Sequence, residues 1–192
     1  MTTRTADPRV HQLFVDRWSP RAFDESAIPD ADLAVIFEAA GLAPSAFNYQ
    51  PWKFLYARRG DAHWDSFLSA LVPFNQSWAK DAGVLVYILS DTRITQDESE
   101  TDFYSHSFDA GAAWAQMALQ ATALGYHAHG MTGLDFDKAR DVLAVPPRFR
   151  VEAAVAIGRR DEPERLPEGL REREVPSTRK PIDEIAVAGP FA

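Results

Sequence analysis

The segment that most constrains the fold is a helical pattern from Asp109 to Leu124 that contains few polar side chains. Alanine, leucine, methionine and tryptophan occur nearly all round the predicted helix. A helix without a polar face must be buried on every side. Gly125 suits the C-terminal cap of this helix. The pattern therefore predicts a central helix, or one at a subunit interface.

Other apolar patterns supply the remaining elements. Val84 to Leu89 is a β-branched apolar run without alternation, which predicts a strand covered on both faces. Further strands are expected at 54–56 and 151–157, and further helices begin within 11–14 and cover 29–41, 64–72 and 137–143. Residues 160–176 are charged and contain three prolines, so they predict an extended arm instead of a core element.

Length and composition indicate one globular domain with such an arm. The chain has 192 residues, of which 46% are hydrophobic and 25% charged. Its net charge of −8 argues against non-specific nucleic-acid binding, which needs clustered cations. The longest apolar run is far shorter than the roughly 20 residues that a membrane span requires. With no secretory pattern after Met1, a cytoplasmic protein without membrane contacts is expected. The absence of cysteine excludes thiol chemistry and disulfides.

The loop from Ala43 to Trp52 combines two prolines with small and hydrogen-bonding side chains. Ser45 supplies a hydroxyl, and Asn48 and Gln50 supply primary amides, which offer both donors and acceptors. Such groups are suited to reading the edge of a heterocycle. An ordinary helix-to-strand loop with local Asx-type bonds explains the same pattern.

A second candidate site precedes it. Arg17, Ser19 and Arg21 are spaced two residues apart, so an extended or turning chain presents all three on one side. Two guanidinium groups and a hydroxyl favour a phosphate, because arginine keeps its charge and presents forked donors. A solvated basic surface patch is the alternative.

Two further segments carry weaker signals. Residues 92–106 are polar and acidic, which predicts a solvated loop or frayed helix. His127 and His129 resemble half of a metal site, but no third ligand pattern completes it, so no metal is expected. Metal hydrolysis remains an alternative that a colourless purified protein would favour.

Together these motifs resemble the FMN-dependent nitroreductase family. The resemblance rests on Ala-Pro-Ser-Ala-x-Asn-x-Gln-Pro-Trp at 43–52 and on Arg-Trp-Ser-Pro-Arg-Ala-Phe at 17–23, in the family's order and spacing. Matches extend over roughly residues 11–187. It implies an α+β nitroreductase-type fold, with a mixed, mainly antiparallel sheet flanked by helices. It also implies a single domain over 1–192 whose arm, about 160–192, is exchanged across a homodimer with two FMN sites.

The resemblance also assigns roles to residues. The cofactor-binding positions that it implies are Arg17, Ser19, Arg21, Pro44, Ser45, Ala46, Asn48, Gln50, Asn75, Met131, Thr132, Gly133 and Arg179. The first three and Arg179 correspond to contacts with the FMN phosphate and ribityl chain. Asn48 and Asn75 correspond to contacts with the ring. The backbone at 131–133, a turn in the family, approaches flavin N5 and O4, and Gly130 and Gly133 suit that close approach. A variable cover over the flavin corresponds to the substrate-pocket candidates Phe103, Tyr104 and His106.

The chain departs from the family pattern at two places. Trp78 occupies a position where relatives often carry a cation near the flavin pyrimidine, and Lys80 follows two residues later. Ser177 replaces a basic residue that commonly accompanies Arg179, so the phosphate grip is either weaker or uses Lys180.

The implied activity is NAD(P)H oxidation by a ping-pong mechanism, with hydride transfer through flavin N5 to nitroaromatics, quinones or other small electrophiles. The flavin carries the chemistry, so no catalytic side chain is assigned. A protein that binds, senses or degrades flavin without routine turnover is the alternative on the same scaffold.

Overall fold

A computed structural model describes residues 4–190 of the chain. Its centre is a four-stranded sheet in the order β1 (Trp52–Arg58), β2 (Val84–Asp91), β6 (Phe149–Gly158) and β5 (His127–Met131). All three pairings are antiparallel, so the sheet expected to be mainly antiparallel is wholly so within the described part of one chain. A register shift between Ile88 and Leu89 bends the β2–β6 ladder.

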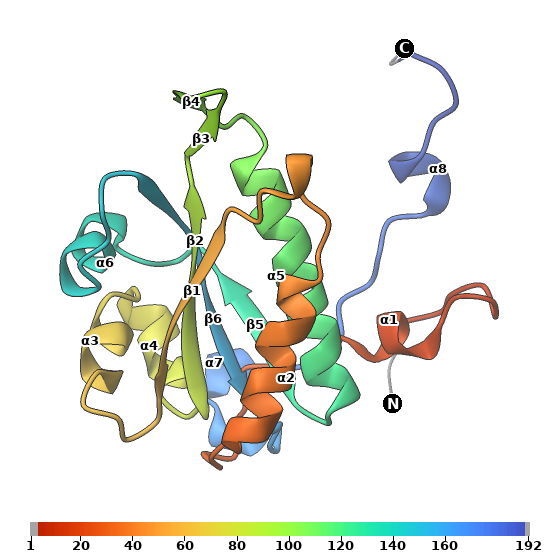
Figure 1. Cartoon of the computed structure of the whole chain (residues 1–192). Helices are drawn as coiled ribbons and strands as arrows, with labels where there is room; N and C mark the ends of the chain where they lie inside the picture. Colours follow the sequence, from red (N-terminus) through yellow and green to blue (C-terminus); the bar gives the residue numbers. More distant parts are fainter. Residues whose placement is uncertain (1–3, 191–192) are drawn as a thin grey trace.

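Helices cover both faces of this sheet, as the apolar run of β2 predicts (Figure 1). Leu85, Tyr87 and Leu89 join one hydrophobic core, and the alternating Val84, Val86 and Ile88 join the other. The first core is closed by α3 (Trp64–Ser69), α4 (Pro73–Ala79) and α6 (Phe136–Val142), and the second by α2 (Asp30–Gly41) and α5 (His106–Ala123). The expected α+β architecture is confirmed.

The long helix α5 differs from its prediction in one respect. It begins three residues earlier than expected, and Ala110, Ala113 and Met117 on its inner face are buried. Its outer face is not, because Gly111 and Ala115 are exposed. Burial on every side is therefore wrong for the single chain, in which the outer face of α5 is apolar and partly exposed.

Several elements of the described chain were not expected from the sequence. Residues 92–106 contain a hairpin of β3 (Arg93–Gln96) and β4 (Ser99–Asp102) instead of a loop or frayed helix. Its turn residues Asp97 and Glu98 both have positive φ, which matches the twist of a two-residue hairpin. Residues 127–131, expected as a turn, form the edge strand β5, and Pro73 starts the helix α4.

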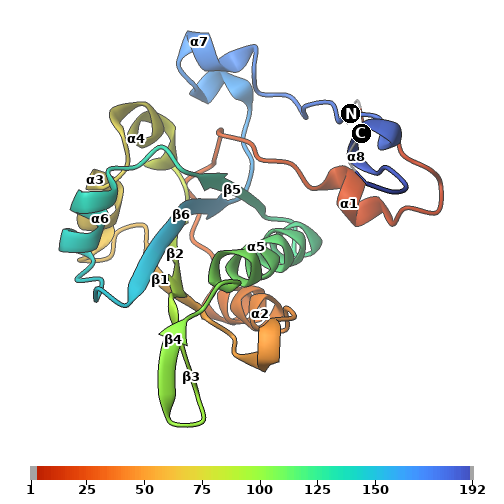
Figure 2. The ribbon, with the colours of Figure 1, turned by 90° about the horizontal axis from the view of Figure 1, so that it is seen from above.

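The arm after β6 has two parts. Its first part contains η2 (Pro163–Arg165) and α7 (Glu168–Arg171), and Leu166 and Leu170 are buried in the first core, contrary to the expectation of an arm outside it. The second part carries α8 (Ile182–Ile185), which stands off from the body on the same side as α1 (Gln12–Asp16) in two perpendicular views (Figures 1 and 2). None of the helices within 4–190 is long and apolar enough to cross a membrane.

Candidate functional site

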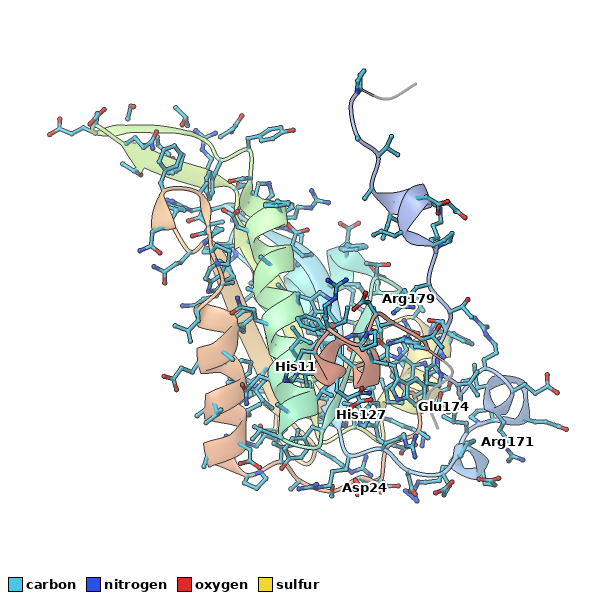
Figure 3. All side chains as sticks on the ribbon, turned by 90° about the vertical axis from the view of Figure 1, so that its right-hand side faces the viewer. His11, Asp24, His127, Arg171, Glu174 and Arg179 are labelled. Carbon is cyan, nitrogen blue, oxygen red and sulfur yellow. The ribbon has the colours of Figure 1, made fainter. Side chains whose placement is uncertain are left out.

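A cavity of about 310 Å³ lies where the segment after α1 meets the C-terminal arm. Its lining contains Arg4, Arg17, Arg21, Arg173 and Arg179, together with Trp18, Ser19, His129, Val175 and Ser177. The structure therefore brings together all four residues predicted to bind phosphate. Figure 3 shows Arg179 and Glu174 of the arm on the face that carries α1 and His127.

The arginines in this cavity repel one another. Burial, and then the charge of Arg179, lowers the pKa of Arg17 below its usual value. Burial also lowers the pKa of Arg21, against the opposing effect of Glu174. Glu174 is itself buried and accepts hydrogen bonds from the backbone N–H groups of Arg21 at 2.7 Å and Ala22 at 2.9 Å. A cavity in which cations are desolvated and crowded is stabilised by binding an anion.

A larger and more apolar cavity of about 640 Å³ adjoins it and shares Arg17 and Ser19. Its lining comprises Phe14, Trp114, Ala115, Ala118, Leu119, Gly130, Met131, Thr132 and Ala153 in addition to the shared pair. Most of these residues belong to the outer face of α5 and to β5, whose outer edge pairs with no strand in the described chain. Unpaired backbone groups on a sheet edge are available to a ligand. The two cavities together suit a flat, largely apolar ring attached to an anion.

At two glycines of this region, neighbouring side chains leave little or no room for a Cβ atom. A Cβ at Gly133 would lie 2.5 Å from Nδ2 of Asn75, and one at Gly130 would lie 3.0 Å from the ring of Trp114. Nδ2 of Asn75 donates to the carbonyl of Gly133 at 2.8 Å, and the Val72 N–H donates to the same oxygen at 3.1 Å. The buried Asn75 therefore fixes the 131–133 turn from behind, and it lines neither cavity.

His129 links the arginine cavity to the first core. Its Nδ1 lies 2.8 Å from the carbonyl oxygen of Pro20, and because a carbonyl only accepts, this nitrogen carries the proton. Its ring lies 4.6 Å from that of the buried Trp78, which also packs against Phe23. The guanidinium of Arg21 stands 5.9 Å from the same indole. Trp78 is thus a core residue behind the turn that carries Ser19 and Arg21.

Both histidines of β5 are held neutral. Burial lowers the pKa of His127 to about 4, and the charges of Arg160 and Arg17 add to this effect. Burial likewise lowers the pKa of His129 to about 4. Since no group of three or more His, Cys, Asp or Glu side chains within 4–190 is arranged to hold a metal ion, these two residues lack the partners that a metal centre needs.

We expect these histidines to make stability depend on pH. Their pKa values lie near 4 in the folded protein and near 6.5 in the unfolded chain. As the pH falls, the unfolded chain therefore protonates these histidines before the folded protein does. The free energy of unfolding therefore falls between pH 6.5 and about 4 and is fully restored above that window. Urea unfolding across this range measures the slope, which the double variant His127→Gln, His129→Gln reduces. An unchanged slope in that variant would contradict the prediction.

The Ala43–Trp52 loop lies away from both cavities in the single chain. It packs on the start of α5, where the Ala46 N–H donates to the buried Asp109 carboxylate at 3.1 Å. Its polar side chains bind within the loop: the Gln50 N–H donates to Ser45 Oγ at 2.9 Å, and Nε2 of Gln50 donates to Asn48. Pro44 is exposed and also lines neither cavity. The local bonds match the simpler interpretation of this loop.

The loop backbone is nevertheless unusual. Phe47, Asn48 and Gln50 all have φ between 53° and 56°, a left-handed conformation that costs non-glycine residues free energy. The Phe47 ring is 78% exposed to solvent. Several strained residues in one exposed loop indicate a constraint beyond the connection of α2 to β1.

The three substrate-pocket candidates are scattered. Phe103 is buried edge-on to Tyr49 at 5.0 Å, and Tyr104 is fully exposed. His106 Nδ1 lies 2.7 Å from the hydroxyl of Ser90, which donates to Glu152 at 2.5 Å. None of the three lines either cavity.

Lys80 lies away from both cavities. Its Nζ pairs with Asp81 at 2.9 Å and lines neither cavity.

Several residues of the site were missed by the sequence analysis. Arg4 donates to the carbonyls of Ser177 and Arg17, which joins the N-terminal segment to the arm. Arg173, Glu174 and Trp114 belong to no motif, because only tertiary packing brings them to the cavities. Asp109 carried a weak signal as an acidic residue in the first turn of a helix.

Comparison with known proteins identifies the family to which this chain is similar. Residues 15–159 match the model of the nitroreductase family. The major NAD(P)H-flavin oxidoreductase of Aliivibrio fischeri is 31% identical over 160 residues, which cover 68% of this chain and 72% of that protein. The CLA biosynthesis enone reductase of Lactiplantibacillus plantarum is 28% identical over 182 residues, which cover 77% and 83%.

A crystal structure of an oxidoreductase containing FMN superimposes with a TM-score of 0.96 and 46% sequence identity, covering 100% of this chain and 98% of that one. The family match spans both strands of the central pair and the segment that carries Arg17, Ser19 and Arg21. The chain belongs to the nitroreductase family.

Proposed function

We propose that the protein is an FMN-dependent NAD(P)H oxidoreductase that reduces small electrophilic acceptors. The observation that carries this proposal is the junction of an apolar cavity with an arginine cavity through Arg17 and Ser19. The FMN in the similar crystal structure and the flavin named in the Aliivibrio relative support it. When bound, FMN would supply hydride transfer from a nicotinamide and electron transfer to an acceptor. Alternation of these two half-reactions is the proposed ping-pong cycle.

Residues of the chain would hold and orient the cofactor. Arg17, Arg21, Arg179 and Ser19 would bind the phosphate by charge-assisted hydrogen bonds. The backbone at Met131, Thr132 and Gly133 would meet the polar edge of the ring, held in place from behind by Asn75. The apolar outer face of α5 would exclude water beside the ring.

Asn75→Ala tests the role of the turn. Loss of its hydrogen bond to Gly133 is expected to destabilise the protein by about 1 kcal/mol, because Val72 still donates to the same carbonyl. The loosened turn is expected to lower FMN occupancy or shift the flavin reduction potential. Asn75→Asp, of similar size but without the amide donor, provides a comparison. If occupancy, potential and turnover of Asn75→Ala all equal those of the parent, Asn75 is structural only.

We further propose a homodimer with shared sites. Large apolar side chains are exposed at Phe14, Phe108, Ile182, Ile185 and Val187, and a contiguous exposed apolar patch would mark an interaction site. Two-fold pairing is the commonest way to cover such a surface. A second subunit that packs against α5 would also bring its own Ala43–Trp52 loop toward the cavities, which would account for the strain in that loop.

Steady-state kinetics with NADH or NADPH and a nitroaromatic or quinone tests the proposed function. Parallel double-reciprocal lines at several acceptor concentrations are expected, because donor and acceptor take turns at one site. A flavin-binding protein without routine turnover would instead retain FMN and show no acceptor-dependent oxidation. Absence of both FMN and turnover would reject the assignment altogether.

A further inference from the structure

A second basic cavity lies directly beside the arginine cavity. Its volume is about 420 Å³, and its lining comprises Arg4, Thr5, Thr178, Arg179, Lys180, Pro181 and Ile182. The two cavities share Arg4 and Arg179. Arg4 also donates to the carbonyls of Arg17 and Ser177, so one side chain connects the walls of both cavities.

The charges on these walls exceed what one phosphate monoester neutralises. Six cations line the pair of cavities: Arg4, Arg17, Arg21, Arg173, Arg179 and Lys180. Among the described residues, two carboxylates oppose them: Glu174 lies behind Arg21, and Glu184 lies 4.0 Å from Lys180. An FMN phosphate adds a charge of about −2, so the described cations on these walls still outnumber the described anions.

The crowding of these cations shifts the pKa of Arg4. Burial lowers the pKa of Arg4, and the neighbouring charges of Arg179 and then Arg17 lower it further. In a chain with a net charge of −8, such a concentration of cations is local and specific to this surface. The second cavity adds two threonine hydroxyls, which complement guanidinium and ammonium donors around phosphate oxygens.

We infer that this second cavity binds a phosphoryl group of the nicotinamide donor, so that a donor with an additional phosphate on its adenosine part is preferred. The inference rests on the proposed function and names NADPH, over NADH, as the donor. Arg179 and Arg4 stand between the two anions, and Lys180, Thr178 and Thr5 contact the second anion alone. The preference arises because NADH places one phosphate fewer among the same cations.

The test measures binding without turnover. The purified protein, supplied with FMN, is titrated calorimetrically with adenosine 2′,5′-bisphosphate and with adenosine 5′-monophosphate. The bisphosphate is expected to bind about ten-fold more tightly, the effect of one additional charge-assisted contact at a partly exposed site. This ratio is expected to fall toward one in Lys180→Gln and as salt is raised. Lys53→Gln, an exposed lysine of β1 outside both cavities, is the matched control and keeps the parent ratio.

Equal affinity for the two nucleotides, or an unchanged ratio in Lys180→Gln, would overturn the inference. Apoprotein titrated with FAD and FMN provides a second arm. If FAD binds more tightly and Lys180→Gln removes the difference, the second phosphoryl site belongs to the cofactor and the inference is wrong. Failure to retain any flavin rejects the proposed function instead, and the nucleotide ratio still distinguishes the two failures.

Discussion

Arg17→Ala is expected to weaken FMN binding by about 1.5–3 kcal/mol, or roughly ten- to a hundredfold in the dissociation constant. Arg17 lines both cavities and is half-buried among other cations, so its contact with a phosphate oxygen is only partly screened by solvent. Fluorescence titration of apoprotein with FMN measures the change. Arg179→Ala is expected to act in the same direction and by a similar amount.

The comparison with riboflavin isolates the phosphate. Riboflavin lacks the anion, so its affinity is expected to be lower than that of FMN in the parent and nearly unchanged in Arg17→Ala. Arg9→Ala is the matched control, since Arg9 is exposed, paired with Asp7 and outside the lining of both cavities. Equal affinity of the parent for FMN and riboflavin would contradict the phosphate site.

Deletion of residues 175–192 is expected to abolish both FMN retention and dimer formation. The deletion removes Val175, Ser177 and Arg179 from the arginine cavity. It also removes the exposed apolar side chains of Ile182 and Ile185, which we propose are covered by a second subunit. Because Glu174 and the buried Leu170 remain, the body of the domain is expected to fold.

Sedimentation and flavin absorbance of the purified variant measure the two losses together. A shorter deletion of residues 188–192 keeps α8 and every cavity residue, so it is expected to behave like the parent. A 1–174 protein that remains dimeric would show that the arm contributes no interface surface. One that binds FMN with parent affinity would show that the arm contributes no charge to the FMN site.

The fold could be predicted where apolar patterns were strong. The unbroken apolar run of β2 indicated a strand covered on both faces, and both cores are present. The strand β5 was missed because His127, His129 and Gly130 have no strand preference, and only its pairing with β6 holds it extended. The β3–β4 hairpin was missed because its turn lacks glycine and because the turn and β4 are acidic. Arg148 neutralises part of that charge through Glu100 at 2.8 Å.

The part of the candidate site that is built from residues close in sequence could be predicted. The spacing of Arg17, Ser19 and Arg21 placed one wall of the anion cavity, because those residues are close in sequence. Arg4 and Arg173 are distant from this motif in sequence. They reach the cavity because the N-terminal segment packs against the C-terminal arm, so local sequence patterns do not reveal them. The Ala43–Trp52 loop lines neither cavity in one chain, so the cofactor contacts proposed for it require the proposed second subunit.

The most direct test of the central claim is an anaerobic titration of the purified protein with NADPH. The yellow colour of bound FMN is expected to bleach as the donor is added, and a nitroaromatic or quinone is expected to restore it. A colourless protein, or a yellow one that neither donor nor acceptor changes, would contradict an FMN-dependent oxidoreductase.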